Sequence, residues 1–138
     1  MEYTIMEYTG YGREELLDLY RQVGWTAYTD RLDTLERAWR NSLLTLGAYA
    51  GDKLVGAVRA VGDGESVVFV QALLVHPAYQ RRGIGGALLR AVEARYPRVR
   101  QLELLTDDTP DTVAFYRALG FLSAEELGCR AFLKLRQL

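Results

Sequence analysis

Apolar positions along the chain follow two periods, and these periods outline its first elements. The run from Tyr3 to Tyr8 is rich in β-forming residues and stops at Gly10, which predicts a first strand. Apolar residues between positions 16 and 23 recur at helical spacing and predict a helix of about 11 residues. After an aromatic linker at 25–28, Asp30 is the expected N-cap of a second helix, whose apolar face carries Leu32, Leu35 and Trp39.

Three further strands are expected between residues 44 and 75. Leu44 to Ala50 and Leu54 to Val61 flank Gly51-Asp52-Lys53, a pattern typical of a hairpin. A second turn at 62–64 leads into Ser66 to Val75. Because that last run is almost wholly apolar, it predicts a strand buried on both faces at the centre of the sheet.

The second half of the chain begins with a glycine-rich turn after Pro77. An amphipathic helix follows this turn and is expected to end before Pro97. Val99 to Thr106 predicts another strand. The next helix should be capped by Thr109, with Pro110 at its first position, and should stop at Gly120.

Two strands are candidates for the end of the chain. Cys129 to Leu135 alternates apolar and polar residues and predicts a closing strand, in which Cys129 would be a small apolar filler. Phe121 to Ala124 is a candidate for one more short strand.

This order of elements predicts an α+β fold with a layered α/β/α arrangement. We expect a mixed, mostly antiparallel central sheet with helices on both faces. The strands at 66–75 and 99–106 should run parallel, because a helix crosses between them, and their ends should splay apart. With 138 residues, 49% of them hydrophobic, the chain is long enough for one core, so residues 1–138 are interpreted as a single domain.

Charge and cysteine content exclude several classes of partner. Lys and Arg total 17 against 18 for Asp and Glu, so a net charge of -1 gives no general attraction to nucleic acid or to an acidic membrane. We find no apolar stretch of membrane-spanning length and no start that resembles a signal peptide. Cys129 is the only cysteine and excludes an internal disulfide, so a cytoplasmic location is expected. His76, the only histidine, makes no metal site by itself.

The glycine-rich turn carries the strongest chemical signal. A strand that runs into such a turn and then into a helix presents unpaired backbone N–H groups at the positive end of the helix dipole, which is a site for phosphate. Arg81 and Arg82 could add charge-assisted bonds, and Gly83, Gly85 and Gly86 allow a close approach. The alternative is an ordinary glycine cap beside solvated arginines. A dinucleotide fold needs a different glycine spacing near the first strand.

Several motifs in this region belong together. Gln80-Arg81-Arg82-Gly83-Ile84-Gly85 matches in full an acyl-CoA signature that reads Gln or Arg, two variable residues, Gly, one variable residue, then Gly or Ala. The segment 73–79 is similar to the strand end that precedes this signature, and the segment 114–121 is similar to a second landmark. The chain thus resembles the GNAT family of N-acetyltransferases, strongly over residues 44–138 and by element order alone before them.

The resemblance implies acetyl-CoA as co-substrate, with no metal. Backbone groups at the end of the 66–75 strand would pair with the pantetheine arm as if it were a short extra strand, and the amides of the turn would bind the pyrophosphate. The cofactor-binding residues implied in this way are Leu73, Leu74, Val75, Gln80, Arg81, Arg82, Gly83, Ile84, Gly85 and Gly86.

Tyr116 is the candidate catalytic residue. The family places a tyrosine here to protonate the departing CoA thiolate, and a phenol with a pKa near 10 keeps its proton at neutral pH. The alternative is an ordinary core aromatic packed beside Phe115 and Phe121.

The general base is open. Relatives often carry Glu where this chain has Gln71-Ala72. Glu103, Asp107, Asp108 or a chain of water molecules could replace that residue. Thr109 stands where relatives often have Asn, and its interpretation as an N-cap is sufficient.

The acceptor is expected to be a small-molecule or peptide amine. In the family, the segment that corresponds to 24–30 forms much of the acceptor wall, so Trp25 and Tyr28 either cover the acceptor or pack the helices onto the sheet. A non-catalytic acyl-CoA-binding sensor or interaction module, and a structural protein with no cofactor, are the alternatives. Monomer and homodimer are both open.

Overall fold

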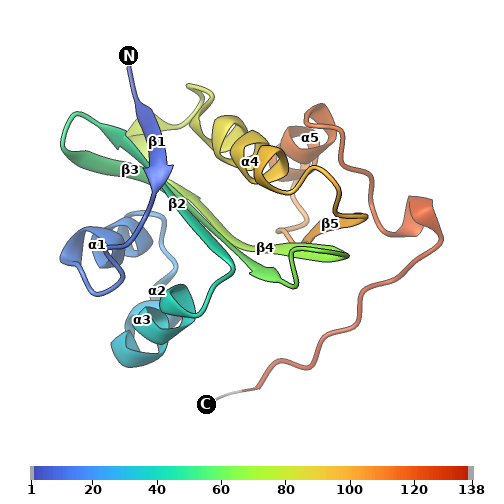
Figure 1. Cartoon of the computed structure of the whole chain (residues 1–138), viewed down its shortest axis with the longest axis horizontal. Coiled ribbons are helices and arrows are strands. Elements are labelled where there is room, and N and C mark those ends of the chain that lie inside the picture. The colour runs from blue at the N-terminus through green and yellow to red at the C-terminus, as the bar shows by residue number, and fades with distance from the viewer. Residues whose placement is uncertain (1, 137–138) are drawn as a thin grey trace. The chain divides into compact units, whose positions relative to one another are not determined.

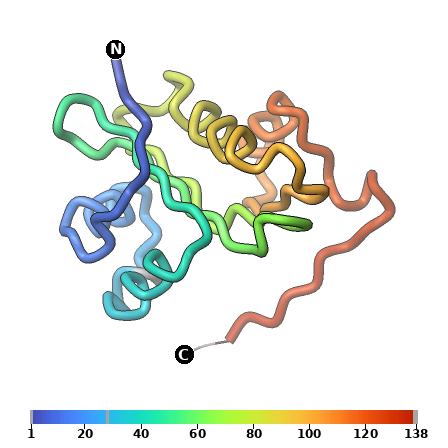
Figure 2. The backbone as a smooth tube through the Cα atoms, viewed as in Figure 1, coloured from blue at the N-terminus to red at the C-terminus, as the bar shows by residue number. Residues whose placement is uncertain are grey.

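The computed structural model of the protein describes residues 2–136 (Figure 1). The chain forms two compact units, Met1–Leu105 and Thr106–Leu138. The larger unit holds a five-stranded sheet and four α-helices. The smaller unit holds α5 (Pro110–Ala118), the short 3-10 helix η2 (Glu125–Leu127) and a C-terminal segment whose backbone runs without helical turns (Figure 2).

The sheet has the strand order β1-β2-β3-β4-β5. Its strands are β1 (Thr4–Glu7), β2 (Leu44–Ala50), β3 (Lys53–Gly62), β4 (Val67–Val75) and β5 (Gln101–Leu104). The first three pairings are antiparallel and the β4–β5 pairing is parallel, which confirms the predicted mixed sheet. The predicted centre was wrong, because β3 lies in the middle and β4 is next to the edge.

Helices cover both faces of the sheet, as predicted (Figure 1). On one face lie α1 (Glu14–Gln22), α2 (Thr26–Thr29) and α3 (Leu32–Arg40), and on the other lies α4 (Ile84–Arg95). Neighbouring residues of β3 show the division. Ala57 belongs to the core cluster of α1 and α3, whereas Gly56 faces Ile84 and Leu88 of α4.

Two details of the first helices differ from the prediction. The expected linker at 25–28 is wrong, because Thr26–Thr29 form the short helix α2. The second predicted helix begins at Leu32 with Arg31 as N-cap, and no side chain makes a cap hydrogen bond there. Asp30 lies one residue too early to take that role. The side chain of Tyr28 lies outside the described part of the chain.

Aromatic side chains join α1, α3 and β1 into one core. Trp39 is fully buried, and its indole Nε1 donates a hydrogen bond of 2.9 Å to Tyr20 Oη. Tyr8 packs edge-to-face on Trp39, with ring centroids 6.0 Å apart. Because the indole N–H of the buried Trp39 has a hydrogen-bond partner, the cluster buries apolar surface without leaving this donor unpaired.

An extra residue in β4 explains why its apolar run misled the prediction. Ala60 pairs with Val70 but Arg59 pairs with Ala72, so Gln71 is the additional residue of a β-bulge. Along β4, every second residue is buried and the residues between them are half-buried or exposed. The prediction of burial on both faces was therefore wrong: each half of β4 buries one face, and the bulge switches which face that is.

The parallel pairing with β5 stops where the bulge begins. The register runs from Val67 opposite Gln101 to Val70 opposite Leu104. Beyond Val70, no strand among residues 2–136 pairs with this edge of β4. The predicted strand at 99–106 is thus four residues long, and the edge of β4 from Gln71 to Val75 is open on that side.

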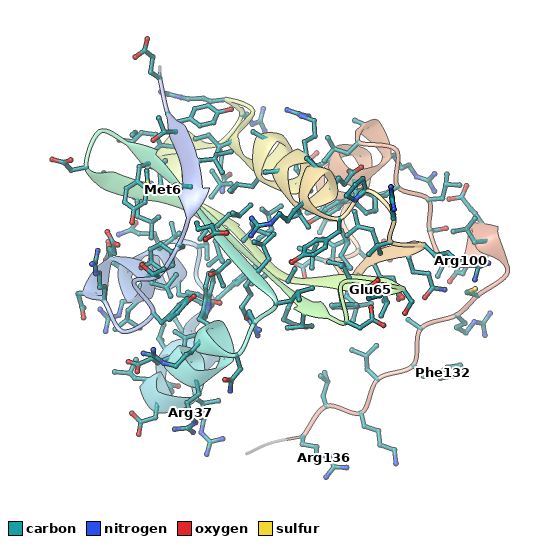
Figure 3. The ribbon with its side chains drawn as sticks, in the orientation of Figure 1. Met6, Arg37, Glu65, Arg100, Phe132 and Arg136 are labelled. Atoms are coloured by element: carbon teal, nitrogen blue, oxygen red, sulfur yellow. The ribbon has the colours of Figure 1, made fainter. Side chains whose placement is uncertain are left out.

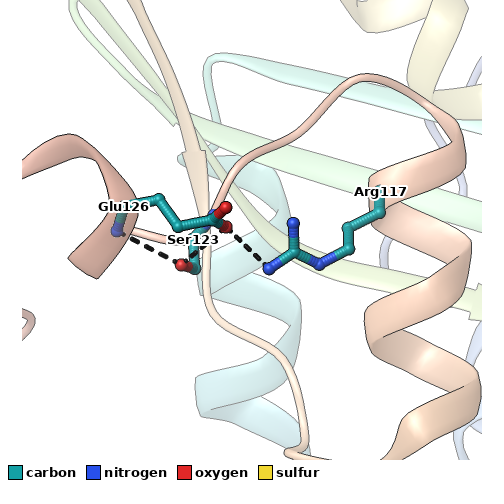
Figure 4. Close-up of polar contacts among 3 residues, drawn as sticks. All are labelled: Arg117, Ser123 and Glu126. Carbon is teal, nitrogen blue, oxygen red and sulfur yellow. Dashed lines mark hydrogen bonds and ion pairs between the residues drawn. The ribbon is translucent and has the colours of Figure 1, made fainter.

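The smaller unit confirms the predicted helix and corrects the predicted ending. Thr109 Oγ1 accepts the amide of Thr112 at 3.3 Å and so caps α5, and Gly120 follows the helix with φ of 93°. In the loop that follows, Glu126 accepts hydrogen bonds from Arg117, 2.6 Å away, and from the amide of Ser123 (Figure 4).

The strands predicted at 121–124 and 129–135 are absent from the described residues. Phe121 instead turns back, its amide donating to the Tyr116 carbonyl at 3.1 Å. The alternation at 129–135 finds no partner strand, and a strand without a hydrogen-bonded neighbour is not formed. Phe132 accordingly projects from an extended segment with 89% of its surface exposed (Figure 3). Cys129 is exposed as well and is not an apolar filler.

Candidate functional site

The candidate site begins where β4 ends and the chain turns towards α4. His76 closes the strand: its amide donates to the Val55 carbonyl at 2.8 Å. Its ring Nδ1 accepts the amide of Ala78 at 3.1 Å and caps the 3-10 helix η1 (Pro77–Tyr79). The only histidine of the chain therefore fixes the start of the turn.

Two left-handed residues shape the turn itself. Arg81 has φ of 63° and Gly83 has φ of 84°. For a residue with a Cβ, this conformation costs about 1–2 kcal/mol, and Arg81 is the only non-glycine residue with positive φ in the part of the chain that the structure describes. Such conformations aim successive amides into one concavity, which is a site for anions. The strain at Arg81 therefore coincides with a potential phosphate site.

The first turn of α4 supplies further free donors. Gly83 is the N-cap, and no side chain makes a cap hydrogen bond to it or to the amides after it. The first intrahelical bond runs from the Ala87 amide to the Gly83 carbonyl at 3.0 Å. The amides of Ile84, Gly85 and Gly86 thus have no carbonyl partner within α4, and they point along the positive end of a 12-residue helix.

The space around this turn is open to a ligand. A Cβ placed on Gly83 would meet only Tyr3 Oη, 3.9 Å away. Tyr3 itself approaches the Gly83 carbonyl at 3.4 Å. Together with the free amides, this open space fits the pyrophosphate of coenzyme A, so the residues present suit the group that the sequence predicts.

Close packing holds α4 beside the end of β4. A Cβ on Gly56 of β3 would lie 3.0 Å from Ile84 Cγ2 and 3.2 Å from Leu88 Cδ1. A larger residue at this position would require Ile84 and Leu88 to move by a few tenths of an ångström. Ile84 and Leu88 are buried in the contact, so the N-terminus of α4 is fixed by the core and not by the turn alone.

Side chains around the turn tie it to the strand and add positive charge. Gln80 Nε2 donates to the Val75 carbonyl at 3.1 Å, which links the first residue of the signature to the end of β4. The Tyr79 ring lies 5.4 Å from Lys53 Nζ and 5.8 Å from Arg82 Cζ. Both cations are within the range of a cation–π contact. Tyr79 therefore gathers two positive charges next to the free amides.

The predicted cofactor-binding residues lie at the end of β4, in the turn and in the first turn of α4, all in the larger unit, and they differ in burial. Leu73 and Val75 are half-buried on the open part of β4. Leu74 is only 1% exposed and packs into the α1 cluster, and Ile84 is equally buried. For these two residues, only backbone atoms are available to a ligand.

Tyr116 lies on α5 in the smaller unit. Its ring packs edge-to-face against Phe115 and Phe121, at centroid distances of 4.9 and 5.8 Å. Burial raises the pKa of Tyr116, and a hydrogen bond with the Thr106 side chain opposes that rise. The phenol is therefore both a packed aromatic and a group that keeps its proton.

The candidates for a general base are all exposed. Glu103 lies on β5 opposite Phe69, and Asp107 and Asp108 precede α5. Gln71 is exposed at the bulge. Trp25, a candidate for the acceptor wall, packs against the core with its ring 6.0 Å from that of Tyr20, which favours the packing role.

Sequence reasoning missed several residues of the site. Tyr3, which precedes β1, and Lys53 of β3 are far from the turn in sequence and carry no local signal, whereas Tyr79 stands directly before the signature and could have been noticed. A carboxylate was missed as well: Glu15 Oε1 accepts hydrogen bonds from Tyr8 Oη at 3.3 Å and Tyr49 Oη at 3.0 Å.

Metal ligands do not gather anywhere in the described part of the chain. Within residues 2–136, no group of three or more His, Cys, Asp or Glu side chains could hold a metal ion. The described helices also include none that is long and apolar enough to cross a membrane.

The open strand edge, the left-handed turn and the helix N-terminus point to the class of acetyltransferases that use acyl-CoA. Residues 12–121 match the model of the acetyltransferase (GNAT) family. This match covers most of the chain, and the protein belongs to the GNAT family. The resemblance noted in the sequence is thereby confirmed, as is the α+β fold.

Solved structures agree with this assignment. A GNAT family acetyltransferase from Streptococcus pneumoniae is 36% identical, with a TM-score of 0.85 over 99% of this chain and 98% of that one. An aminoglycoside acetyltransferase, solved with a bisubstrate analogue of CoA and acetylneamine, has a TM-score of 0.77 over the full length of both chains. At 19% identity, the second likeness shows the fold alone.

Curated relatives match over shorter stretches. A mycothiol acetyltransferase from Kineococcus radiotolerans is 48% identical over 67 residues, which are 48% of this chain and 22% of the relative. An uncharacterised N-acetyltransferase from Pyropia yezoensis is 29% identical over 114 residues, covering 78% of this chain and 63% of the relative. The chain thus spans less than two thirds of the length of these relatives.

Proposed function

We propose that the protein is an N-acetyltransferase that moves an acetyl group from acetyl-CoA directly to a primary amine of a small molecule or peptide. In this proposal residues 1–138 work as one domain. The observation that carries it is the turn from Gln80 to Gly86, where a complete acyl-CoA signature coincides with left-handed backbone and unpaired helix amides.

The binding of acetyl-CoA is assigned to backbone groups. The amides from Arg81 to Gly86, with the guanidinium groups of Arg81 and Arg82, hold the pyrophosphate. The open edge of β4 at Leu73, Leu74 and Val75 pairs with the amides of the pantetheine arm. Acetyl-CoA supplies an acetyl group activated as a thioester. This division explains why the ligand needs both an unpaired strand edge and a helix N-terminus.

The transfer needs two proton movements. The neutral amine nitrogen of the acceptor attacks the thioester carbonyl carbon, a C–N bond forms and the C–S bond breaks. Tyr116 Oη gives its proton to the departing sulfur, and its raised pKa keeps that proton in place at neutral pH. The surplus proton of the amine passes to water or to Glu103, Asp107 or Asp108. Relatives often carry Glu where this chain has Gln71, whose exposed amide is not a base. A chain of water molecules is therefore one route for this proton.

The name of one relative supports a small-molecule acceptor. This relative, 48% identical over 67 residues, is named a mycothiol acetyltransferase. Such a name indicates the chemical class of the acceptor and does not identify the acceptor of this chain.

Acetyl-CoA binding and turnover are tested separately. At 100 times its dissociation constant, acetyl-CoA should stabilise the protein by about 2.7 kcal/mol, which is about 9 °C in Tm for this chain length. CoA release is then measured with a panel of amines for the native chain and for Tyr116→Phe. We expect turnover by the native chain and a loss of about 100-fold or more in kcat for the variant, with an unchanged thermal shift.

Each outcome separates the alternatives. A thermal shift without CoA release from any amine would support a non-catalytic acyl-CoA-binding module, to which the missing carboxylate at Gln71 already lends some weight. The absence of both signals would refute binding and transfer together. Equal kcat values for the native chain and Tyr116→Phe would remove only the role of Tyr116.

A further inference from the structure

Arg59 is a charged side chain inside the larger unit that the proposed chemistry does not use. It lies on β3, opposite Thr45 of β2 and Ala72 of β4. Successive residues of a strand face opposite sides of the sheet, and Ala57, two residues earlier, packs into the α1 and α3 cluster. Arg59 therefore lies on the face that α1, α2 and α3 cover.

The guanidinium of Arg59 has an incomplete set of partners. Its Nη1 donates to Ser42 Oγ at 3.3 Å. Its Nε is buried and has no hydrogen-bond partner, and it is the only such side-chain atom found within residues 2–136. Across the same residues, Arg59 makes no ion pair with a carboxylate. The residue as a whole is half-buried, but a buried donor without a partner loses its hydration and gains nothing in return.

The neighbours of Arg59 are neutral and already occupied. Ser42 Oγ donates to the Ala38 carbonyl at 2.7 Å, near the C-terminal end of α3. Thr45 Oγ1 donates to the Tyr8 carbonyl at 2.7 Å and bonds to Tyr11 Oη at 3.2 Å. The negative end of α3 offsets part of the charge, but no atom there meets Nε. A planar group with two acceptor oxygens, as in a carboxylate, matches the geometry of Nε and Nη.

Arg59 lies close to the part of the sheet where β4 and β5 no longer pair. Its partner Ala72 is the first residue after the bulge at Gln71, where the pairing of β4 and β5 has ended. Paired residues on neighbouring strands have Cα atoms about 5 Å apart. Arg59 thus lies one strand away from the open edge to which the pantetheine arm, which carries the thioester, is assigned.

We propose that Arg59 recognises a carboxylate of the acceptor, so that the amine acetylated by this protein belongs to an amino acid or a similar carboxylate-bearing compound. This inference rests on the proposed function, since it names the acceptor class of the same site. The carboxylate is unchanged by the reaction and serves to hold the amine beside the open edge of β4.

The test compares matched acceptors that differ only in this group. CoA release is measured for several amino acids and for their primary amides, and the ratio of kcat/KM is taken for each pair. A charge-assisted contact predicts a preference of about tenfold to a hundredfold for the carboxylate, mainly in KM of the amine. In Arg59→Gln the ratio should fall to near one, and Arg59→Lys should retain part of it.

Controls separate recognition from a structural effect. A change that only loosens the fold lowers both rates of a pair and leaves their ratio intact. Arg90→Gln, at an exposed position of α4, removes one positive charge and should keep the ratio of the native chain. The Tm of each variant is measured as well. If Arg59→Gln does not fold, the ratio of the native chain and that of Arg59→Lys decide the matter.

The failures of the two proposals are distinguishable. If the native chain acetylates amides as fast as the free amino acids, or if Arg59→Gln keeps the preference, the role of Arg59 is refuted while the transfer to amines stands. If no amine gives CoA release, the function and the inference both fall.

Discussion

The left-handed conformation of Gly83 offers a direct test of the turn. Gly83→Ala places a Cβ in open space, because only Tyr3 Oη would lie within 4 Å, so the effect comes from the backbone. Holding alanine at φ of 84° costs about 1–2 kcal/mol, and the less flexible unfolded chain returns about 0.4–1 kcal/mol. The net loss is about 1 kcal/mol. With an unfolding entropy of about 2.1 cal/mol/K per residue over 138 residues, Tm should fall by about 3–4 °C.

The matched control is Gly24→Ala. Gly24 has φ of 81°, and a Cβ added there would have nothing within 4 Å, but this glycine follows α1 and lies outside the turn. Both variants should lose the same stability in thermal unfolding without ligand. In Gly83→Ala alone, any part of this strain that the free turn relieves by leaving the left-handed conformation is imposed again on binding, so the dissociation constant of acetyl-CoA should rise, at most about fivefold, which corresponds to about 1 kcal/mol.

Calorimetric titration with acetyl-CoA provides the decisive comparison. Equal affinities in the two alanine variants would show that the conformation of Gly83 does not matter for the ligand. Gly83→Asn serves as a further check, because asparagine adopts the left-handed region more readily, and it should recover part of the affinity.

Three further predictions concern stability. Gly56→Val should lower the free energy of unfolding in urea by about 1–3 kcal/mol, because its Cβ would lie 3.0 Å from Ile84 Cγ2. The variant should also bind acetyl-CoA more weakly. An unchanged midpoint of urea unfolding would refute the tight packing of α4. Burial, followed by the hydrogen bond to Glu15, raises the pKa of Tyr49 to about 12. The unfolded chain therefore releases this proton first, and stability present below about pH 10 is lost as the pH rises towards 12. In Tyr49→Phe, the free energy of unfolding should fall less steeply over the same interval, from about pH 10 to 12, and parallel curves for the two chains would contradict this. Thr109→Val removes the cap of α5 and should cost about 1 kcal/mol with faster hydrogen exchange of the Thr112 amide, whereas Thr109→Ser should retain the native rate.

The sequence predicted the turn and the helices better than the sheet. The signature from Gln80 to Gly85 is local, so its residue types alone indicate the backbone that they form. The bulge at Gln71 has no such signal, because an extra residue is visible only against the partner strand. An apolar run interrupted only by Gln71 therefore looked like a strand buried on both faces. At the end of the chain, the alternation from Cys129 to Leu135 described a strand that has no partner among the described residues.

In the candidate site too, the local motifs were predictable and the long-range contacts were not. Backbone donors of the turn and the tyrosine on α5 follow from motifs that are continuous in the chain. Lys53 and Arg59 reach the site region through the pairing of β3, and Tyr3 reaches it from the residue before β1, so their roles depend on distances that no spacing encodes. Leu74 lies in the run that the sequence predicted as buried, but the pattern did not show that its neighbours Leu73 and Val75 are only half-buried.

The bulge at Gln71 has a consequence for how substitutions in β4 will behave. Val68 and Val70, before the extra residue, are directed to the side of α4, whereas Ala72 and Leu74, after it, are directed to α1. Mutations only four residues apart on one strand should therefore disturb different halves of the interior. Deleting Gln71 would make Val70 and Ala72 neighbours, so the pairs Val70 with Ala60 and Ala72 with Arg59 would follow each other without a bulge, and each half of β4 would keep the face that it has now.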